Sequence, residues 1–162
     1  MKRFIACLLS SFFIFAGTTL AVKEQFPFIA EVIADKVHIR AGQDKNFESI
    51  GRLAKGEQVV VAGRIYSWYK IKLPNNALSY IRSDYVQVLA DNIGEIVSPR
   101  VNVRAGAGIN FTSLGQLPKG TKVRIIETAA GWHKIEPVEG CYGWVTTKFL
   151  TFKFKDIDDG SH

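Results

Sequence analysis

The chain has 162 residues, of which 47% are hydrophobic, 22% charged and 12% aromatic. This composition supplies enough apolar side chains for a packed core, and it excludes a disordered tail and a collagen-like polymer. The formal net charge is +6, but the basic residues are spread along the chain without a long run, which excludes a dedicated nucleic-acid-binding arm.

The first predicted element is a secretory signal peptide over residues 1–21. Lys2 and Arg3 precede an apolar run, and Ala21 is the small residue at the end of a cleavage site. The run is interrupted by serine and glycine and falls short of the roughly 20 apolar residues of a membrane span, which weighs against an uncleaved anchor. We therefore expect a mature chain that starts near Val22 and has no transmembrane span. It would be periplasmic, or secreted and associated with the cell wall.

Cysteine usage and charge limit the chemistry of the mature chain. Cys7 lies in the signal segment, so the mature chain keeps only Cys141, which excludes an internal disulfide and a cysteine-rich metal site. Removing two of the 21 basic residues leaves 19 against 15 acidic ones, a formal charge of +4. This charge can attract anionic envelope polymers, although ordinary surface charge for solubility is the simpler explanation. Because the sequence has no zinc-binding spacing and no phosphate loop, we expect no metal and no cofactor.

A long internal repeat follows the signal segment. The stretch that starts at Val37, VHIRAGQDKNFESIGRLAKGEQVVV, recurs at Val101 as VNVRAGAGINFTSLGQLPKGTKVRI, an offset of 64 residues. The offset holds without a gap between residues 29–86 and 93–150, and 17 of these 58 positions are identical. The mature chain is therefore a tandem duplication.

Within each unit the hydrophobic pattern has a period of two and is interrupted by turns that contain glycine, which predicts small β-domains without helices. The predicted strands of the first unit, each repeated 64 residues later, are near 29–33, 37–40, 57–62, 68–73, 78–82 and 85–89. Gly42 and Gly106 end the opening strand and are predicted to adopt φ > 0. Tight turns are expected at Lys55-Gly56 and Lys119-Gly120, and hairpin turns at Asn75-Asn76 and Glu139-Gly140.

The order of these motifs resembles the bacterial SH3-like repeat. VNVRAGAGINFTSLGQLPKGTKVRII is followed by GWHKI and GWVTTKFL, and the first unit has Ser-Trp and Ser-Tyr in place of the two Gly-Trp pairs. The resemblance implies an all-β fold of two tandem small SH3-like barrels. The predicted organisation is a signal peptide (1–21), an N-terminal lead (22–28), SH3-like repeat 1 (29–92), SH3-like repeat 2 (93–152) and a polar tail (153–162).

The resemblance also indicates where a ligand binds. The segment YIRSDYV resembles the closing motif of eukaryotic SH3 domains, whose aromatic groove takes proline-rich peptides. Arg82 and Thr146 stand where that groove has its proline, which argues against polyproline recognition. The candidate ligand-binding residues are the groove tryptophans Trp68 and Trp132, the closing-turn aromatics Tyr85 and Phe149, and the neighbouring Tyr66 and His133.

Each aromatic side chain has packing in the barrel core as its alternative role. Phe47, Phe111, Tyr80, Trp144 and Phe149 are expected to fill the core rather than contact a ligand. Trp68 and Trp132 are different, because Ile71 and Ile135, three residues later on the same strands, fall on the opposite face. If the isoleucines point inward, the tryptophans point outward, either as a ligand platform or as a cover for the barrel end.

Catalysis has little support in the sequence. His133 precedes Cys141 by eight residues, so facing strands would bring a base to a nucleophile. However, the equivalent residues in repeat 1 are Tyr69 and Ala77, which indicates that both positions serve packing. We predict that the protein is not an enzyme and has no catalytic residues.

The resemblance implies a non-catalytic exported adaptor that engages cell-wall peptidoglycan or another envelope component. The alternative is a protein–protein interaction module that recognises an extended peptide at Trp68 and Trp132. The connection between the repeats, residues 87–92, is too short for a flexible linker and lacks Gly, Ser and Pro. The two barrels should therefore hold a preferred orientation.

Overall fold

The computed structural model describes residues 24–153, which consist of short strands and two single-turn 3₁₀ helices. The predicted signal peptide, Cys7 and the tail from residue 154 lie outside the described residues. In repeat 1 the elements are β1 (Phe28–Val32), β2 (Val37–Arg40), β3 (Ser49–Leu53), β4 (Gln58–Ile65), β5 (Trp68–Lys72), β6 (Tyr80–Arg82), η1 (Ser83–Tyr85) and β7 (Val86–Val88). In repeat 2 they are β8 (Ile93–Ile96), β9 (Arg100–Arg104), β10 (Ser113–Pro118), β11 (Lys122–Ala129), β12 (Trp132–Ile135), β13 (Tyr142–Thr146), η2 (Thr147–Phe149) and β14 (Leu150–Phe152).

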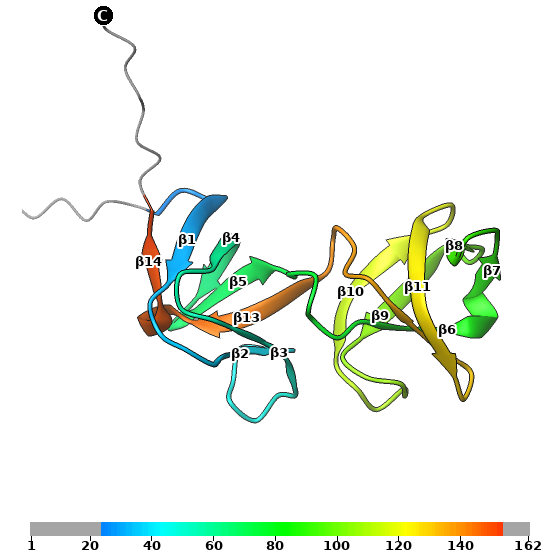
Figure 1. Cartoon of the computed structure of the whole chain (residues 1–162), viewed down its shortest axis with the longest axis horizontal. Coiled ribbons are helices and arrows are strands. Elements are labelled where there is room, and N and C mark those ends of the chain that lie inside the picture. Colours follow the sequence, from blue (N-terminus) through cyan, green and yellow to red (C-terminus); the bar gives the residue numbers. More distant parts are fainter. Residues whose placement is uncertain (1–23, 154–162) are drawn as a thin grey trace, which may run out of the picture.

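The strands form two seven-stranded sheets that lie side by side (Figure 1). One sheet has the order β14-β1-β4-β5-β13-β2-β3, and the other has the order β10-β9-β6-β12-β11-β8-β7. Every strand pair in both sheets is antiparallel. The prediction of an all-β chain with two SH3-like units is therefore confirmed, and within residues 24–153 no helix is long and apolar enough to cross a membrane.

The two repeats exchange their last strands. β13 and β14 belong to repeat 2 but pair with β5, β2 and β1 of repeat 1. Conversely, β6 and β7 belong to repeat 1 but pair with β12, β9 and β8 of repeat 2. We call the unit built on β1–β5 barrel 1 and the unit built on β8–β12 barrel 2.

This exchange corrects the expectation that residues 29–92 and 93–152 would each close a barrel. Residues 73–79 and 136–141 carry the chain from one barrel to the other, so the turns at Asn75-Asn76 and Glu139-Gly140 are not hairpins. They still turn the chain, since the Ala77 N–H donates to the Pro74 carbonyl at 3.0 Å and Gly140 has a φ of 91°. β6 and β13 occupy equivalent positions in the duplication. β13 therefore pairs with β5 in the same register in which β6 pairs with β12.

The junction between the repeats is itself a β-hairpin inside barrel 2. β7 pairs with β8, and the turn between them places Asp91 and Asn92 at φ values of 57° and 61°. Aspartate and asparagine tolerate this left-handed region better than other residues with a side chain. The junction is therefore a tight turn and not a spacer, as the composition of residues 87–92 predicts.

β3 and β10 are absent from the strands predicted by a hydrophobic period of two, because each contains a bulge. The pairing of β2 with β3 shifts register opposite Ile39 and Arg40, which leaves Ile50 as the extra residue, and Leu114 holds the same place in β10. Both extra residues are buried. A bulge breaks the alternation of inward and outward side chains, so Ile50 and Leu53 point inward at a spacing of three.

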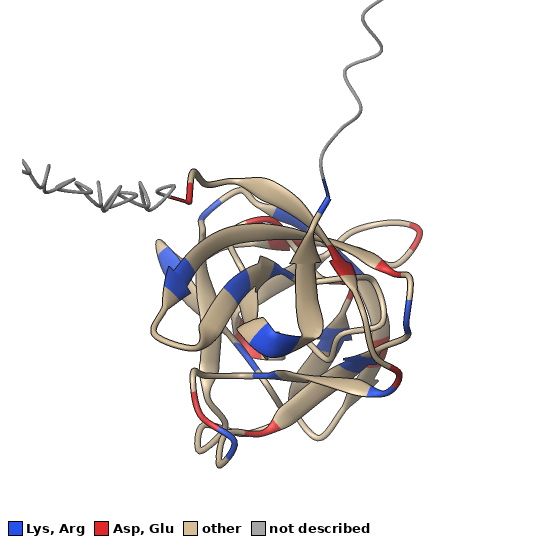
Figure 2. Ribbon diagram, turned by 90° about the vertical axis from the view of Figure 1, so that its left-hand side faces the viewer, with Lys and Arg blue, Asp and Glu red and all other residues tan. Residues whose placement is uncertain are grey.

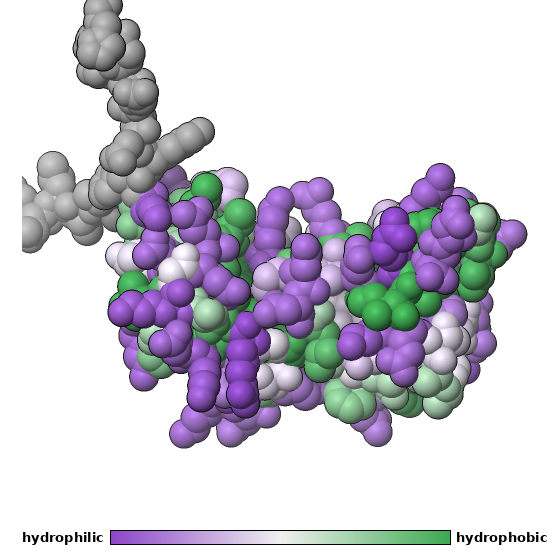
Figure 3. Space-filling view, in the orientation of Figure 1, coloured by the Kyte–Doolittle hydropathy of each residue, from purple (hydrophilic) through white to green (hydrophobic). Residues whose placement is uncertain are grey.

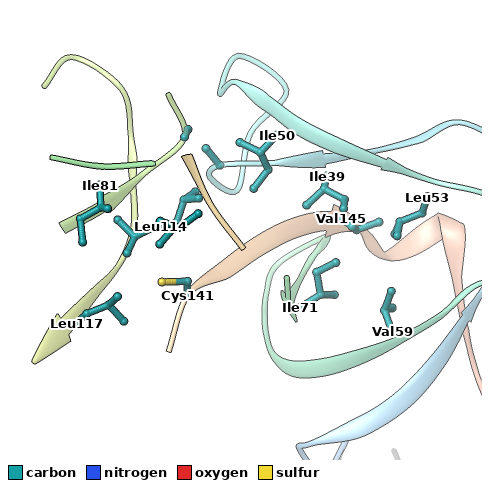
Figure 4. Close-up of a cluster of buried hydrophobic side chains, with 14 of the residues drawn as sticks. Ile39, Ile50, Leu53, Val59, Ile71, Ile81, Leu114, Leu117, Cys141 and Val145 are labelled. Atoms are coloured by element: carbon teal, nitrogen blue, oxygen red, sulfur yellow. The ribbon is translucent and has the colours of Figure 1, made fainter. Parts of the chain in front are cut away.

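The cores of the two barrels are continuous at their contact. Ile39, Ile71 and Val145 fill barrel 1, and the buried side chains continue through Cys141 to Leu114 of barrel 2 (Figure 4). Between the two long loops, the Thr112 N–H donates to Glu48 Oε1 at 3.0 Å. Burial raises the pKa of Glu48, but hydrogen bonds from Thr112 and from the backbone of Glu48 itself outweigh it, so the net pKa is lowered.

The glycines after the opening strands have a packing role that differs from the predicted one. The described glycines with positive φ are Gly56, Gly120, Gly131 and Gly140, which confirms the two Lys-Gly turns and excludes Gly42 and Gly106. A Cβ atom on Gly42 would lie 2.7 Å from the ring of Phe47, and one on Gly106 would lie 2.5 Å from the ring of Phe111. The long loop therefore needs glycine because an aromatic ring packs on it. Both rings remain partly exposed on the loop, rather than filling the core as expected.

Substituting Gly42 or Gly106 by Ala should lower the free energy of unfolding by about 1 kcal/mol, because the aromatic ring must move away. Gly63→Ala is the control, since a Cβ there would meet only the Lys70 Cβ at 4.0 Å. Urea denaturation measures all three variants. Equal stability of the Gly42 and Gly63 variants would contradict the packing role.

Candidate ligand-binding grooves

A groove of about 470 Å³ opens beside Trp68, and we call it the Trp68 groove. Its aromatic residues are Trp68 from β5 and Phe149 from η2. The remaining lining comes from the β1–β2 turn, β2, the following loop, the β4–β5 turn, the end of β13 and η2, namely Asp35, Lys36, Val37, His38, Arg40, Asp44, Lys45, Ser67, Thr146 and Lys148. η2 faces the viewer in Figure 2, so this groove lies at one end of the molecule.

The equivalent groove in barrel 2 lies beside Trp132 and has a volume of about 200 Å³. Its aromatic residues are Trp132 from β12 and Tyr85 from η1. Its other lining residues are Arg82, Arg100, Val101, Asn102, Arg104 and Ile109. A second hollow of about 220 Å³ also borders Trp132, together with Tyr80 and Lys134.

Each groove combines one aromatic residue from repeat 1 with one from repeat 2. Barrels closed by residues 29–92 and 93–152 alone would combine Trp68 with Tyr85 and Trp132 with Phe149. The structure instead places Trp68 with Phe149 and Trp132 with Tyr85. The strand exchange is the physical reason, since it carries η2 to barrel 1 and η1 to barrel 2. Since the η elements lie at opposite ends of the long axis, the two grooves do as well (Figure 1).

The tryptophans reach the grooves because of the alternation along β5 and β12. Ile71 and Ile135 are fully buried, whereas Trp68 and Trp132 lie on the other face and remain partly exposed. This confirms the predicted orientation of both side chains. A rigid strand therefore presents each indole ring to the groove, which is a favourable platform for a ligand.

Two further residues of the predicted site lie elsewhere. Tyr66, in the turn between β4 and β5, is 90% exposed and does not line either groove. His133 is 4% exposed, points to the face opposite Trp132, and its Nδ1 lies 2.7 Å from Thr128 Oγ1. Burial lowers the pKa of His133, so the ring is neutral and enclosed at pH 7. The strand period could have identified His133 as inward-facing, because it precedes the inward Ile135 by two residues.

The pair of His133 and Cys141 has the character of packing residues. Cys141 is 2% exposed and its counterpart Ala77 is 5% exposed, so both positions fill the region where the chain crosses between barrels. Burial raises the pKa of the Cys141 thiol to about 11. A thiol with that pKa is protonated at pH 7 and is a poor nucleophile.

Alkylation of Cys141 in the native protein should therefore be slow below pH 9 and fast in denaturant. The raised folded-state pKa also means that native stability is retained below the unfolded-state value near 8.5 and is lost as the pH rises toward 11. Mass spectrometry after timed alkylation measures the first effect, and urea titrations between pH 8 and pH 11 measure the second. Cys141→Ala, which introduces the residue of the other repeat, is the control and should remove the contribution of this thiol to the pH dependence. Rapid native labelling at pH 7 would contradict the buried thiol.

Cationic side chains outnumber acidic ones in the lining of both grooves. Lys36, Arg40, Lys45 and Lys148 contribute to the Trp68 groove, and three arginines contribute to the Trp132 groove. Arg40 Nη1 donates to the Phe47 carbonyl at 3.1 Å and Arg104 Nη1 to the Phe111 carbonyl at 2.9 Å, which fixes both long loops beside the grooves. Hydrophilic residues cover most of the face shown in Figure 3, with apolar groups between them on both barrels. Within residues 24–153, no group of three His, Cys, Asp or Glu side chains could hold a metal ion.

Comparison with known proteins agrees with this architecture. Over 142 residues the chain is 27% identical to the putative N-acetylmuramoyl-L-alanine amidase YrvJ of Bacillus subtilis, covering 78% of this chain and 27% of the amidase. Over 54 residues it is 44% identical to the probable endopeptidase p60 of Listeria innocua, covering 33% of this chain and 12% of that protein. It is also 34% identical over 70 residues to bacteriocin BCN5 of Clostridium perfringens, covering 42% of this chain and 8% of the bacteriocin.

The chain thus spans about a quarter or less of these relatives. The family model of the bacterial SH3 domain matches residues 35–87 and again residues 99–151. These ranges hold the aromatic residues of both grooves and the strands that the repeats exchange. The chain therefore belongs to the bacterial SH3 domain family, of which it carries two consecutive copies.

Proposed function

We propose that this protein is a non-catalytic binding module that holds onto cell-wall peptidoglycan through the Trp68 and Trp132 grooves. The observation that carries the proposal is the pair of equivalent surface grooves, each with a tryptophan on a rigid strand, a second aromatic ring and a cationic rim. Aromatic platforms with a few charged groups are typical of sites that bind short polymer segments.

The relatives indicate the class of ligand. One is named for the N-acetylmuramoyl-L-alanine linkage, and another is named an endopeptidase. Peptidoglycan stems carry carboxylate groups, which suit the positive rims of both grooves. The predicted export of the chain would bring the grooves to this polymer, either in the periplasm or at the outer surface of the cell.

Recognition of proline-rich peptides is less compatible with the grooves. Thr146 and Arg82 line them at the positions where a eukaryotic SH3 groove has its proline, so the stacked ladder that accepts a polyproline II helix is incomplete. Binding of another extended envelope peptide remains the alternative, and the experiment below separates it from wall binding.

Co-sedimentation with purified sacculi tests the proposal. The mature protein should sediment with sacculi at moderate salt, and the Trp68→Ala, Trp132→Ala double variant should lose most of this binding. Removal of a central aromatic contact typically weakens binding by about 2 kcal/mol, or roughly thirtyfold. Each single variant should retain the binding of its intact groove.

Tyr66→Ala is the matched control, because Tyr66 is an exposed aromatic residue that lines neither groove. It should sediment like the unmodified protein. A protein that stays in the supernatant while it binds one peptide or protein from an envelope extract would favour the alternative. If the protein sediments at low salt but not at moderate salt, and the double variant behaves in the same way as the unmodified protein, the binding is general charge attraction.

A further inference from the structure

The two grooves share their aromatic residues but differ in the acidic residues around them. Asp35 and Asp44 line the Trp68 groove beside its four lysine and arginine residues. The duplication places Pro99 and Gly108 at the equivalent positions, and among the described residues no carboxylate lines the Trp132 groove. The counterparts of Lys36 and Arg40 are also cationic, Arg100 and Arg104, whereas neither carboxylate of the Trp68 groove has a counterpart in the lining of the Trp132 groove.

Three guanidinium groups surround the Trp132 groove, and they have few partners of their own. Arg104 Nη1 donates to the Phe111 carbonyl at 2.9 Å, and Arg82 Nε donates to Asp84 Oδ2 at 2.9 Å, which leaves other N–H groups of both forks available. The guanidinium of Arg100 has no hydrogen bond or ion pair within residues 24–153. Asp84 offsets the charge of Arg82, but within residues 24–153 no carboxylate pairs with Arg100 or Arg104. These two like charges repel each other, and a bound anion would relieve that repulsion.

We propose that the Trp132 groove is an oxyanion site, which binds a phosphate or carboxylate group of the envelope polymer through Arg82, Arg100 and Arg104. This inference rests on the proposed function and assigns the chemistry of one of its two grooves. The planar fork of arginine pairs with both kinds of oxyanion through parallel hydrogen bonds, which a lysine cannot do. Trp132 and Tyr85 flank the site, so a sugar or aliphatic carbon next to the anion has an aromatic surface to contact.

The Trp68 groove is the internal control for this assignment. Lys36 is the counterpart of Arg100, and Thr146 is the counterpart of Arg82. With Asp35 and Asp44 also present, this groove suits a ligand that carries both an amine and a carboxylate, and it should bind a simple anion weakly. A preference for oxyanions should therefore be confined to barrel 2.

The test titrates glycerol phosphate, and separately N-acetyl-D-alanine, into the full protein while NMR follows the indole N–H signals of Trp68 and Trp132. The Trp132 signal should shift with at least one probe at moderate salt, and the probe that binds more tightly identifies phosphate or carboxylate as the source. Arg100→Ala should weaken that binding about tenfold, as expected for a lost hydrogen bond to a charged group. Lys36→Ala should leave it unchanged.

The inference is wrong if neither probe shifts Trp132, or if Lys36→Ala weakens binding as much as Arg100→Ala. Arg100→Lys should recover only part of the affinity, since it restores the charge without the fork. Sedimentation with sacculi by a protein that binds neither probe would overturn the oxyanion site and leave the proposed function intact. Binding of a probe by a protein that does not sediment with sacculi would support the oxyanion site and contradict the proposed function.

Discussion

A chain cut between Ala90 and Asp91 should remain a single folded particle with both barrels intact. The cut severs the peptide chain between the repeats, but each half still contributes strands to the other half's sheet. Ile81 and Val86 are buried in barrel 2, and Val145 and Leu150 are buried in barrel 1. At about 2 kcal/mol for each of these side chains, their burial contributes ~8 kcal/mol in favour of association, which opposes the entropic cost of joining two chains.

The experiment introduces a protease site into the turn between β7 and β8 and measures the mass of the cleaved protein by light scattering. The uncut chain gives the reference mass. A cut chain that also carries Val145→Asp is the matched control, because a charge at this fully buried position should expel β13 and separate the halves. Two independent half-mass species from the cut chain without Val145→Asp would mean that each repeat closes its own barrel.

Phe149→Ala should weaken ligand binding at Trp68, although Trp68 and Phe149 belong to different repeats. In a Trp132→Ala background, where only the Trp68 groove binds, Phe149→Ala should reduce the affinity for solubilised peptidoglycan about tenfold. Tyr85→Ala in the same background should have no effect, because Tyr85 lines the other groove. Isothermal titration calorimetry on both variants measures the difference.

The reciprocal background completes the test. With Trp68→Ala, the Tyr85→Ala substitution should reduce binding and Phe149→Ala should not. The opposite result, in which each closing-turn aromatic acts on the tryptophan of its own repeat, would contradict the composite grooves. Thermal denaturation of each variant confirms that lost binding does not come from lost folding.

Much of the fold could be predicted because its determinants are local. The duplication, the alternation that buries Ile71 and exposes Trp68, and the turns at Gly56 and Gly120 all follow from neighbouring residues in the sequence. β3 and β10 could not be predicted from a period of two, since their bulges place inward residues at a spacing of three. The role predicted for Gly42 was wrong, because the sequence does not distinguish a glycine required by positive φ from one required by a packed ring, here that of Phe47.

The strand exchange, and with it the composition of the grooves, depends on long-range pairing. Tyr80-Ile81-Arg82 and Trp144-Val145-Thr146 have the same pattern of a half-exposed aromatic, a buried aliphatic and a polar residue, so either segment suits either sheet. Periodicity identifies both segments as strands but contains no information about which sheet receives them. Trp68, Trp132, Tyr85 and Phe149 therefore line the grooves, each tryptophan with the closing-turn aromatic of the other repeat, and their contact with a ligand stays a prediction.

Disulfide trapping across the exchanged strands tests the arrangement most directly. Lys70 is paired with Trp144 in barrel 1, and Lys134 is paired with Tyr80 in barrel 2. If each repeat closed its own barrel, the duplication would instead pair Lys70 with Tyr80 and Lys134 with Trp144. Directly opposed residues of antiparallel strands have Cα atoms about 4.5–5.5 Å apart, which suits a disulfide.

Four double-cysteine variants are made in a chain with Cys7 and Cys141 replaced by Ala. Two of them, 70/144 and 134/80, join residues that are paired in the exchanged barrels. The other two, 70/80 and 134/144, join residues that would be paired if each repeat closed its own barrel. Mild oxidation followed by non-reducing mass analysis of the monomer should show an internal disulfide in the 70/144 and 134/80 pairs. The 70/80 and 134/144 pairs should remain reduced. Internal disulfides in the 70/80 and 134/144 pairs, with none in the other two, would show that the repeats fold separately and would contradict the exchanged barrels and the composite grooves.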